Sequence, residues 1–303
     1  MIIRFMGRTA LGLVAAACLA AGTHVAAQQL AMEPLKDAGT NIYPAYEGWY
    51  QNEDGSYSLL IGYYNRNKKQ ALDIPIGPEN RIEPGGPDQG QPTHFDVGRG
   101  WGTIVIKVPK DFGDKKLTWT LTANGRTVSV PFGITKGYQI EPYLDAAMGN
   151  KPPVVKFSEQ GEALTGPPKL TASGMASGAV GEPITLSFWV SDDGHEETPT
   201  GGSAAAPPPG GAAGPPRRPR VSTTLTKYRG PGVVTFADAT PAIEKDKVTT
   251  TATFSMAGEY WVRIEGNDAS GLGGGGFQCC WTTAYIKVTV KAASTGGSPF
   301  VLR

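Results

Sequence analysis

Short runs of alternating apolar and polar residues are the main pattern along this chain. Residues 56–65 and 116–123 are typical, and the second run places Trp119 on an apolar face. A repeat of two is typical of a β-strand with one buried face. The spacing of an amphipathic helix is almost absent, and only residues 142–148 have enough of it for one or two helical turns. The pattern therefore predicts an all-β protein.

Turn signals separate these runs in the first half of the chain. The chain holds 41 glycines and 25 prolines, many of them between the alternating runs. Asp-Gly at 54–55 and Asn-Gly at 124–125 offer the positive-φ residues that tight hairpins require. About six strands at this spacing in residues 41–138 predict an antiparallel β-sandwich.

A second antiparallel sandwich is predicted between residues 169 and 291. The segment 139–168 that precedes it carries two Pro-Pro pairs, which are typical of an extended, semi-rigid spacer. Residues 195–219 interrupt the second series of strands and consist mainly of Gly, Ala, Ser and Pro. Such a composition buries too little apolar surface to offset the entropy of ordering, so we expect a disordered insertion there and a flexible tail at 292–303.

The start of the chain has the order of a secretory signal peptide. A short basic region leads into an apolar stretch at 10–21, and small residues at 25–27 predict cleavage that removes residues 1–27. The stretch is shorter than the ~20 residues that cross a bilayer. Export to the periplasm or the cell exterior is expected, with 28–40 as a leading segment. The alternatives are an uncleaved anchor and a lipoprotein acylated at Cys18, although the apolar run continues past that cysteine.

Charge narrows the range of partners. Loss of Arg4 and Arg8 with the signal peptide lowers the 28 basic residues to 26, against 27 acidic ones. Nucleic acid binding requires a concentrated basic face, which this balance disfavours. No stretch after residue 27 is long and apolar enough for a membrane helix. The expected partner is a protein or a glycan at the cell envelope.

Five short motifs within about 120 residues of the second series resemble a bacterial immunoglobulin-like domain, of the broad group that includes PKD and cadherin-like modules. They are GEPITL at 181–186, SDDG at 191–194, AGEYWV at 257–262, NDASG at 267–271 and YIKVTV at 285–290. The resemblance implies a two-sheet sandwich with an adhesive, scaffolding or spacer role. It implies no active site, because such folds host unrelated functions. The insertion and the pair Cys279-Cys280 depart from the usual pattern, and the first sandwich matches no family.

Cys279 and Cys280 are the cysteines that remain once the signal peptide is removed. Two cysteines in an exported protein predict a disulfide. A bridge between neighbours is strained, because ordinary disulfides place Cα atoms ~5.5 Å apart and adjacent residues ~3.8 Å apart. With Phe277 and Trp281 beside it, the bridge would form an apolar pad for a ligand or a redox switch. A purely structural bridge, two reduced thiols and capture of a soft metal are the alternatives.

The polar stretch 76–101 is the most promising segment of the first sandwich, since a long loop without regular structure is often functional. His94 and Asp96, with Asp88 nearby, offer groups that could bind a ligand or a metal. Their spacing matches no zinc or hydrolase signature, and a histidine hydrogen-bonded to the backbone is the simpler interpretation. The other histidine after the signal peptide, His195, lies at the start of the predicted insertion, which argues against a histidine-based triad.

Three carboxylates are expected at corners of the second sandwich, namely Asp192, Asp193 and Asp268. Cadherin-like folds hold calcium through carboxylates at such corners. Asp-Gly corners also occur simply as turns. Calcium is therefore an alternative to a cofactor-free protein.

The sequence favours a non-catalytic, exported binding, adhesion or envelope-scaffold protein. It has no G-x-S-x-G elbow. One alternative is a carbohydrate-recognising accessory protein, which predicts two or three coplanar exposed aromatic rings. The other is a small hydrolase with its site in 76–101, which predicts that Asp88, His94 or Asp96 meets another polar group in a concave pocket.

Overall fold

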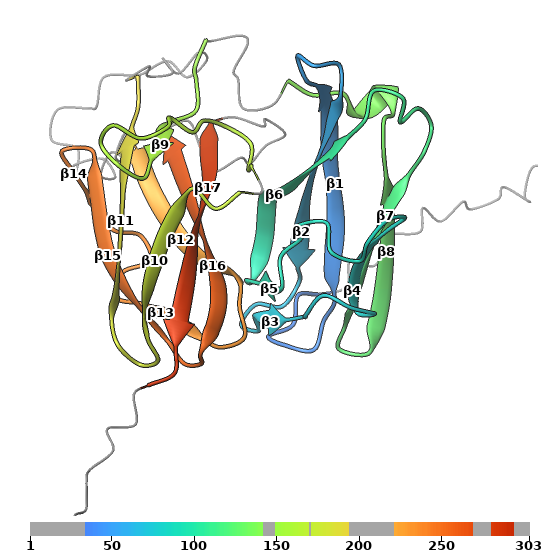
Figure 1. The fold of residues 1–303 in the computed structure, drawn as a ribbon. Helices are drawn as coiled ribbons and strands as arrows, with labels where there is room; N and C mark the ends of the chain where they lie inside the picture. The colour runs from blue at the N-terminus through green and yellow to red at the C-terminus, as the bar shows by residue number, and fades with distance from the viewer. Residues whose placement is uncertain (1–33, 142–148, 170, 194–220, 269–279, 294–303) are drawn as a thin grey trace, which may run out of the picture. The chain divides into compact units, whose positions relative to one another are not determined.

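The computed structural model describes residues 34–141, 149–169, 171–193, 221–268 and 280–293. Leu35–Arg303 forms one compact unit. Apart from one 3-10 turn, η1 (Lys136–Tyr138), the regular structure of the described residues consists of β-strands (Figure 1). The predicted all-β fold class is confirmed. The expectations for the signal peptide, the 142–148 helix, the insertion and most of the tail concern residues outside this description.

The first sandwich contains eight strands. They are β1 (Ile42–Gln51), β2 (Tyr57–Asn65), β3 (Leu72–Asp73), β4 (Asn80–Glu83), β5 (His94–Phe95), β6 (Gly98–Val108), β7 (Leu117–Ala123) and β8 (Arg126–Phe132). One sheet has the order β1-β2-β6, the other has the order β4-β7-β8, and β3 pairs with β5. Asn124 and Gly125 have φ values of 49° and 74°, as the predicted hairpin between β7 and β8 requires. Trp119 is fully buried in the core, as its position in the alternating run predicts.

The prediction of a long loop at 76–101 is wrong, because this stretch contains β4, β5 and the start of β6. β4 was missed because one of its inward-facing residues is polar. Asn80 is fully buried, and its Nδ2 donates to Ile74 O (2.9 Å) and Pro92 O (2.8 Å). Its Oδ1 accepts from Trp119 Nε1 at 3.0 Å. The amide of Asn80 can be buried because its hydrogen bonds are satisfied. It occupies an inward position where an apolar residue would be expected, so β4 shows no apolar–polar alternation in the sequence.

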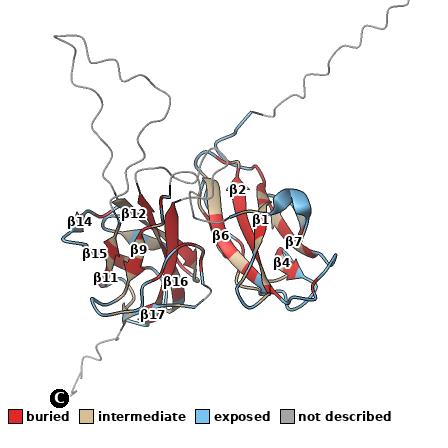
Figure 2. Cartoon of the chain, turned by 90° about the horizontal axis from the view of Figure 1, so that it is seen from above, coloured by how far each residue is buried: buried red, intermediate tan, exposed pale blue. Residues whose placement is uncertain are grey.

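The second sandwich contains nine strands. They are β9 (Val154–Lys156), β10 (Gly174–Ala179), β11 (Ile184–Ser191), β12 (Val221–Arg229), β13 (Val234–Phe236), β14 (Ile243–Glu244), β15 (Lys247–Phe254), β16 (Gly258–Asp268) and β17 (Trp281–Lys291). One sheet has the order β9-β11-β15-β13, and the other has the order β10-β17-β16-β12. With β9, β11, β12, β13, β15, β16 and β17 taken as strands A to G, this is the ABED and CFG arrangement of an immunoglobulin-like sandwich. In each sandwich the buried residues gather on the strands (Figure 2).

β9 corrects the interpretation of 139–168 as a spacer. It pairs with β11, and Val155 is fully buried in the second core. Leu164 is also buried and exchanges two backbone hydrogen bonds with Val155. The strand is only three residues long and follows a Pro-Pro pair. A run that short carries too little alternation to be recognised.

Candidate functional site

One face of the second sandwich is covered by the first. The residues of β12, β16 and β17 that point away from their own core form what we call the docked face. Three of its aromatic members, Tyr228, Trp281 and Tyr285, are 3%, 1% and 0% exposed. Tyr285 Oη donates to Thr103 O of β6 at 3.0 Å, and Thr93 N donates to Tyr228 O at 3.1 Å. The two sandwiches are therefore joined by side-chain and backbone hydrogen bonds.

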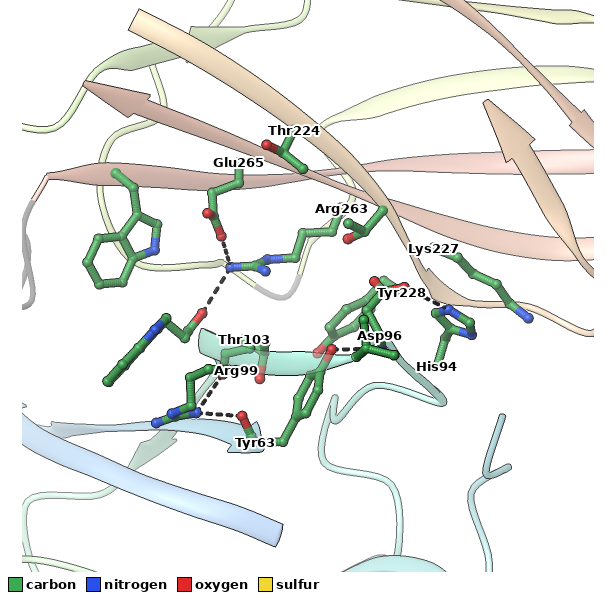
Figure 3. A pocket seen from close by; sticks show the side chains of 15 residues that line it. Tyr63, His94, Asp96, Arg99, Thr103, Thr224, Lys227, Tyr228, Arg263 and Glu265 are labelled. Carbon is green, nitrogen blue, oxygen red and sulfur yellow. Dashed lines mark hydrogen bonds and ion pairs between the residues drawn. The ribbon is translucent and has the colours of Figure 1, made fainter. Parts of the chain in front are cut away.

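A cavity of about 370 Å³ lies between the docked face and strands β2, β5 and β6 (Figure 3). Its lining includes four basic groups and two carboxylates, namely His94, Arg99, Lys227, Arg263, Asp96 and Glu265. The lining comes from both sandwiches, so the site exists only when they are joined. Sequence reasoning singled out His94, Asp96 and Trp281 from this lining, and the cavity brings them together.

His94 lies between two carboxylates, and the prediction of a backbone partner is wrong. Its Nδ1 is 2.9 Å from Asp73 Oδ1, and its Nε2 is 3.2 Å from Asp96 Oδ1. Lys227, whose side chain is 5% exposed, also donates to Asp73 Oδ1 at 2.7 Å. Burial favours the neutral ring, but the two carboxylates outweigh it and raise the pKa of His94 to about 9. At neutral pH His94 is therefore a cation with both nitrogens engaged.

Glu47 is a part of the site that sequence reasoning missed. It occupies the β-bulge between Tyr46 and Gly48 in β1, and a bulge redirects the side chain of the extra residue. Its side chain is 2% exposed and accepts from Arg99 Nη2 at 2.6 Å and from Gly102 N at 2.8 Å. Burial raises the pKa of Glu47 to about 7, although both donors favour the charged form. An acidic residue within an aromatic-rich strand was the signal available in the sequence.

Gly62 makes room for this pair. A Cβ atom at position 62 would lie 2.1 Å from Glu47 Oε1 and 2.2 Å from Gly100 O. Arg99 is held further by Tyr63 O and Gly100 O, each 2.7 Å from its Nη1. The guanidinium carbon lies 4.1 Å from the centre of the Trp101 ring, within the range of a cation–π contact. The glycine, the carboxylate and the indole together fix the orientation of Arg99.

Arg263 anchors the opposite wall of the cavity. It forms an ion pair with Glu265, and its Nη2 donates to Trp101 O at 3.0 Å and to Thr283 Oγ1 at 3.3 Å. Glu265 Oε1 also accepts from Asn267 Nδ2 at 3.2 Å. These contacts hold the charged groups of β16 in fixed positions against β6.

Asp88 lies at the contact between the two sandwiches but does not line the cavity. Its carboxylate accepts from both terminal nitrogens of Arg229, at 2.7 and 3.1 Å. Arg229 Nε donates to Gln91 O at 2.8 Å, and Tyr228 Oη donates to Gly90 O at 2.5 Å. Although burial opposes it, the bond with Arg229 lowers the pKa of Asp88. Asp88 therefore joins the two sandwiches.

The predicted apolar pad is described only in part. Cys279 and Phe277 lie outside the described residues. Cys280 is fully buried and disulfide-bonded. Trp281 packs against Leu60 of β2 and lines the cavity. The pairing of Cys280 with Cys279 stays a prediction.

The three carboxylates considered for calcium lie among the described residues, and calcium stays a prediction. Asp192 and Asp193 follow β11, and Asp268 ends β16. Asp268 Oδ2 accepts from the buried Asn150 Nδ2 at 2.7 Å. Within the described ranges, no group of three or more His, Cys, Asp or Glu side chains is arranged to hold a metal ion. Over the same ranges, no helix has the length and apolarity needed to cross a membrane.

No family model matches the chain. No curated protein matches it either. Among solved structures, a titin pair of tandem immunoglobulin domains aligns with 84% of this chain and 100% of its own, at 11% identity and a TM-score of 0.22. The immunoglobulin-like assignment rests on the strand order of the second sandwich.

Proposed function

We propose that this chain is an exported, non-catalytic binding or scaffold protein whose two sandwiches act as one rigid module. The observation that carries the proposal is the docked face. Tyr285 is fully buried against the first sandwich and bonded to Thr103 O. A sandwich that worked alone would expose this ring to water. Rigid presentation of the remaining surface suits an adhesive or scaffolding role at the cell envelope.

The state of His94 supports binding rather than hydrolysis. The hydrolase alternative required His94 to meet another polar group in a pocket, and it does so with Asp73 and Asp96. A general base, however, needs an open nitrogen and a pKa near the working pH. Both nitrogens of His94 face carboxylates, and its pKa is raised to about 9. Its hydrogen bonds therefore stabilise charges instead of activating a nucleophile.

Export rests on the leader sequence, and the mass of the processed chain tests it. Expression from the full reading frame in a bacterial host should give an envelope or medium fraction with Gln28 at the N-terminus. Intact cytoplasmic protein would contradict export. A lipid-modified Cys18 would replace the proposed cleavage site with a lipoprotein anchor.

The binding role is tested by crosslinking in the producing cell. Val233 and Met256 are 65% and 51% exposed, and Val233 is bonded to Ser255 beside Met256. Exposed apolar neighbours are candidate contact positions. A photoreactive residue at 233 or 256 should give a discrete adduct, and the same residue at the exposed Lys110 serves as control. A chain that forms no specific adduct at either position and binds no envelope component would contradict the proposal.

A further inference from the structure

We infer that the cavity between the two sandwiches binds a neutral saccharide unit. The inference rests on the proposed binding function and gives that function a ligand class. It follows from the charge balance of the walls, the open polar groups beside an indole ring, and the size of the space.

The walls are charge-balanced, which favours an uncharged ligand. The four basic groups of the lining are each paired with a carboxylate: Arg99 with Glu47, Lys227 with Asp73, Arg263 with Glu265, and His94 with Asp73 and Asp96. Four basic groups thus face four carboxylates. An ionic ligand would have to displace a partner from one of these pairs. A hydroxyl both donates and accepts, so a polyol can bond to either kind of group without separating them.

The open groups of the cavity match a sugar ring. Asp96 is 45% exposed at its side chain, and its hydrogen bond to His94 uses Oδ1. Thr224 offers a hydroxyl from β12 toward the same space (Figure 3). Trp101 is partly exposed and held under Arg99, whereas the other aromatic residues of the lining, Tyr63, Tyr228 and Trp281, are buried. The cavity therefore offers one ring to a sugar in place of the two or three coplanar exposed rings expected of a carbohydrate-recognising protein. A pyranose presents a hydrophobic C–H face and a rim of hydroxyls, which an indole and a carboxylate can meet together.

The size and rigidity of the cavity set the length of the ligand. A volume of about 370 Å³ lies at the low end of the ~300–1,000 Å³ typical of ligand pockets. This suits one or two sugar units. Arg99 and Arg263 are already fixed by Glu47 and by Trp101 O, so little side-chain ordering remains to oppose binding.

The test uses the processed full chain on a glycan array, with each positive glycan titrated by calorimetry. Asp96→Asn and Thr224→Val keep the shape of their side chains and should each lower the affinity, by about tenfold for Asp96→Asn, because a hydrogen bond to a charged group is lost. Asp37→Asn, in an exposed ion pair with Lys69 outside the cavity, and Thr289→Val, at an exposed position of β17, are the matched controls and should bind as wild type. Unchanged thermal unfolding of each variant shows that the fold is kept.

Three results would overturn the inference. The first is wild-type affinity in both cavity variants, which would place the site elsewhere. The second is a preference for acidic sugars over neutral ones. The third is the absence of any glycan ligand. If crosslinked adducts at 233 or 256 persist in that last case, the binding function stands and the ligand class alone is wrong.

Discussion

The outward-facing side chains of the two sheets of the second sandwich differ in size and in burial. On β11 and β15 the residues that point away from the core are mostly small and polar, such as Thr185, Ser187 and Thr249, and they are at least partly exposed; we call this the open face. The docked face instead carries buried Tyr228 and Tyr285. Both sheets alternate with the same period. The chemistry of the outward positions therefore distinguishes a solvated face from one that another sandwich covers.

Truncation of Tyr285 should give the largest effect. Tyr285→Ala removes a fully buried ring and its bond to Thr103 O, and should lower the free energy of unfolding by about 3–5 kcal/mol. Thr249→Ala on the open face should change it by less than about 0.5 kcal/mol. Urea unfolding followed by tryptophan fluorescence measures both values. Equal effects at the two positions would show that the docked face is not covered in solution.

Strands β11, β12, β15, β16 and β17 were predictable because apolar residues recur at alternate positions on their core-facing side. β17 nevertheless carries a signal of docking, since Trp281 and Tyr285 point outward while Ala284 and Ile286 point inward. Large apolar residues on both faces of a strand indicate burial on both sides. The motif YIKVTV was recognised for its fold, and its outward tyrosine was overlooked.

The partners across the cavity could not be predicted from the sequence. His94 and Asp96 are two residues apart and were identified as candidates. Lys227 lies 154 positions after Asp73, and Arg263 lies 162 positions after Trp101. Pairs at such separations depend on how two sandwiches join, and no local pattern encodes that arrangement. Glu47 was missed for a different reason, since a bulge reverses the side that alternation assigns to it.

A methyl group at position 62 should have the next largest effect. Gly62→Ala places a carbon against Glu47 Oε1 and Gly100 O, and should cost about 1–3 kcal/mol because the Glu47–Arg99 pair must move. Gly137→Ala is the control, since a Cβ there meets no atom within 4 Å. Thermal unfolding measures both variants. A Gly62→Ala chain as stable as wild type would mean that the pair is not held in the arrangement described.

Two ionisable groups of the first sandwich, His94 and Glu47, should make stability depend on pH. The pKa of His94 is raised from 6.5 to about 9, so its stabilising effect is complete below pH 6.5 and is lost as the pH rises through 9. The decrease between pH 6.5 and 8 should be on the order of 1–2 kcal/mol. His94→Gln should remove this decrease. Glu47 acts in a lower window, because its pKa is raised from 4.5 to about 7 and stability falls as the pH rises between these values.

The two pH ranges allow the effect of Glu47 on stability to be measured apart from that of His94. Glu47→Gln should flatten the profile between pH 4.5 and 7 and leave the decrease above pH 7 in place. His94→Gln should do the reverse. Urea midpoints measured at half-unit pH intervals give both profiles. A decrease above pH 7 that survives in His94→Gln would assign it to another group.

The ion pair between Asp88 and Arg229 should contribute least. The side chain of Asp88 is 49% exposed, and that of Arg229 is 20% exposed. Partly solvated pairs are worth about 0.2–1 kcal/mol, so Asp88→Asn should lower the free energy of unfolding within that range. Glu162→Gln, in the more exposed and longer pair with Lys169, should have no measurable effect. A double-mutant cycle of Asp88→Asn with Arg229→Gln isolates the coupling between the two side chains. Coupling at or below that of the Glu162–Lys169 pair would mean that Arg229 joins the sandwiches through Gln91 O alone, and that Asp88 adds nothing to the contact.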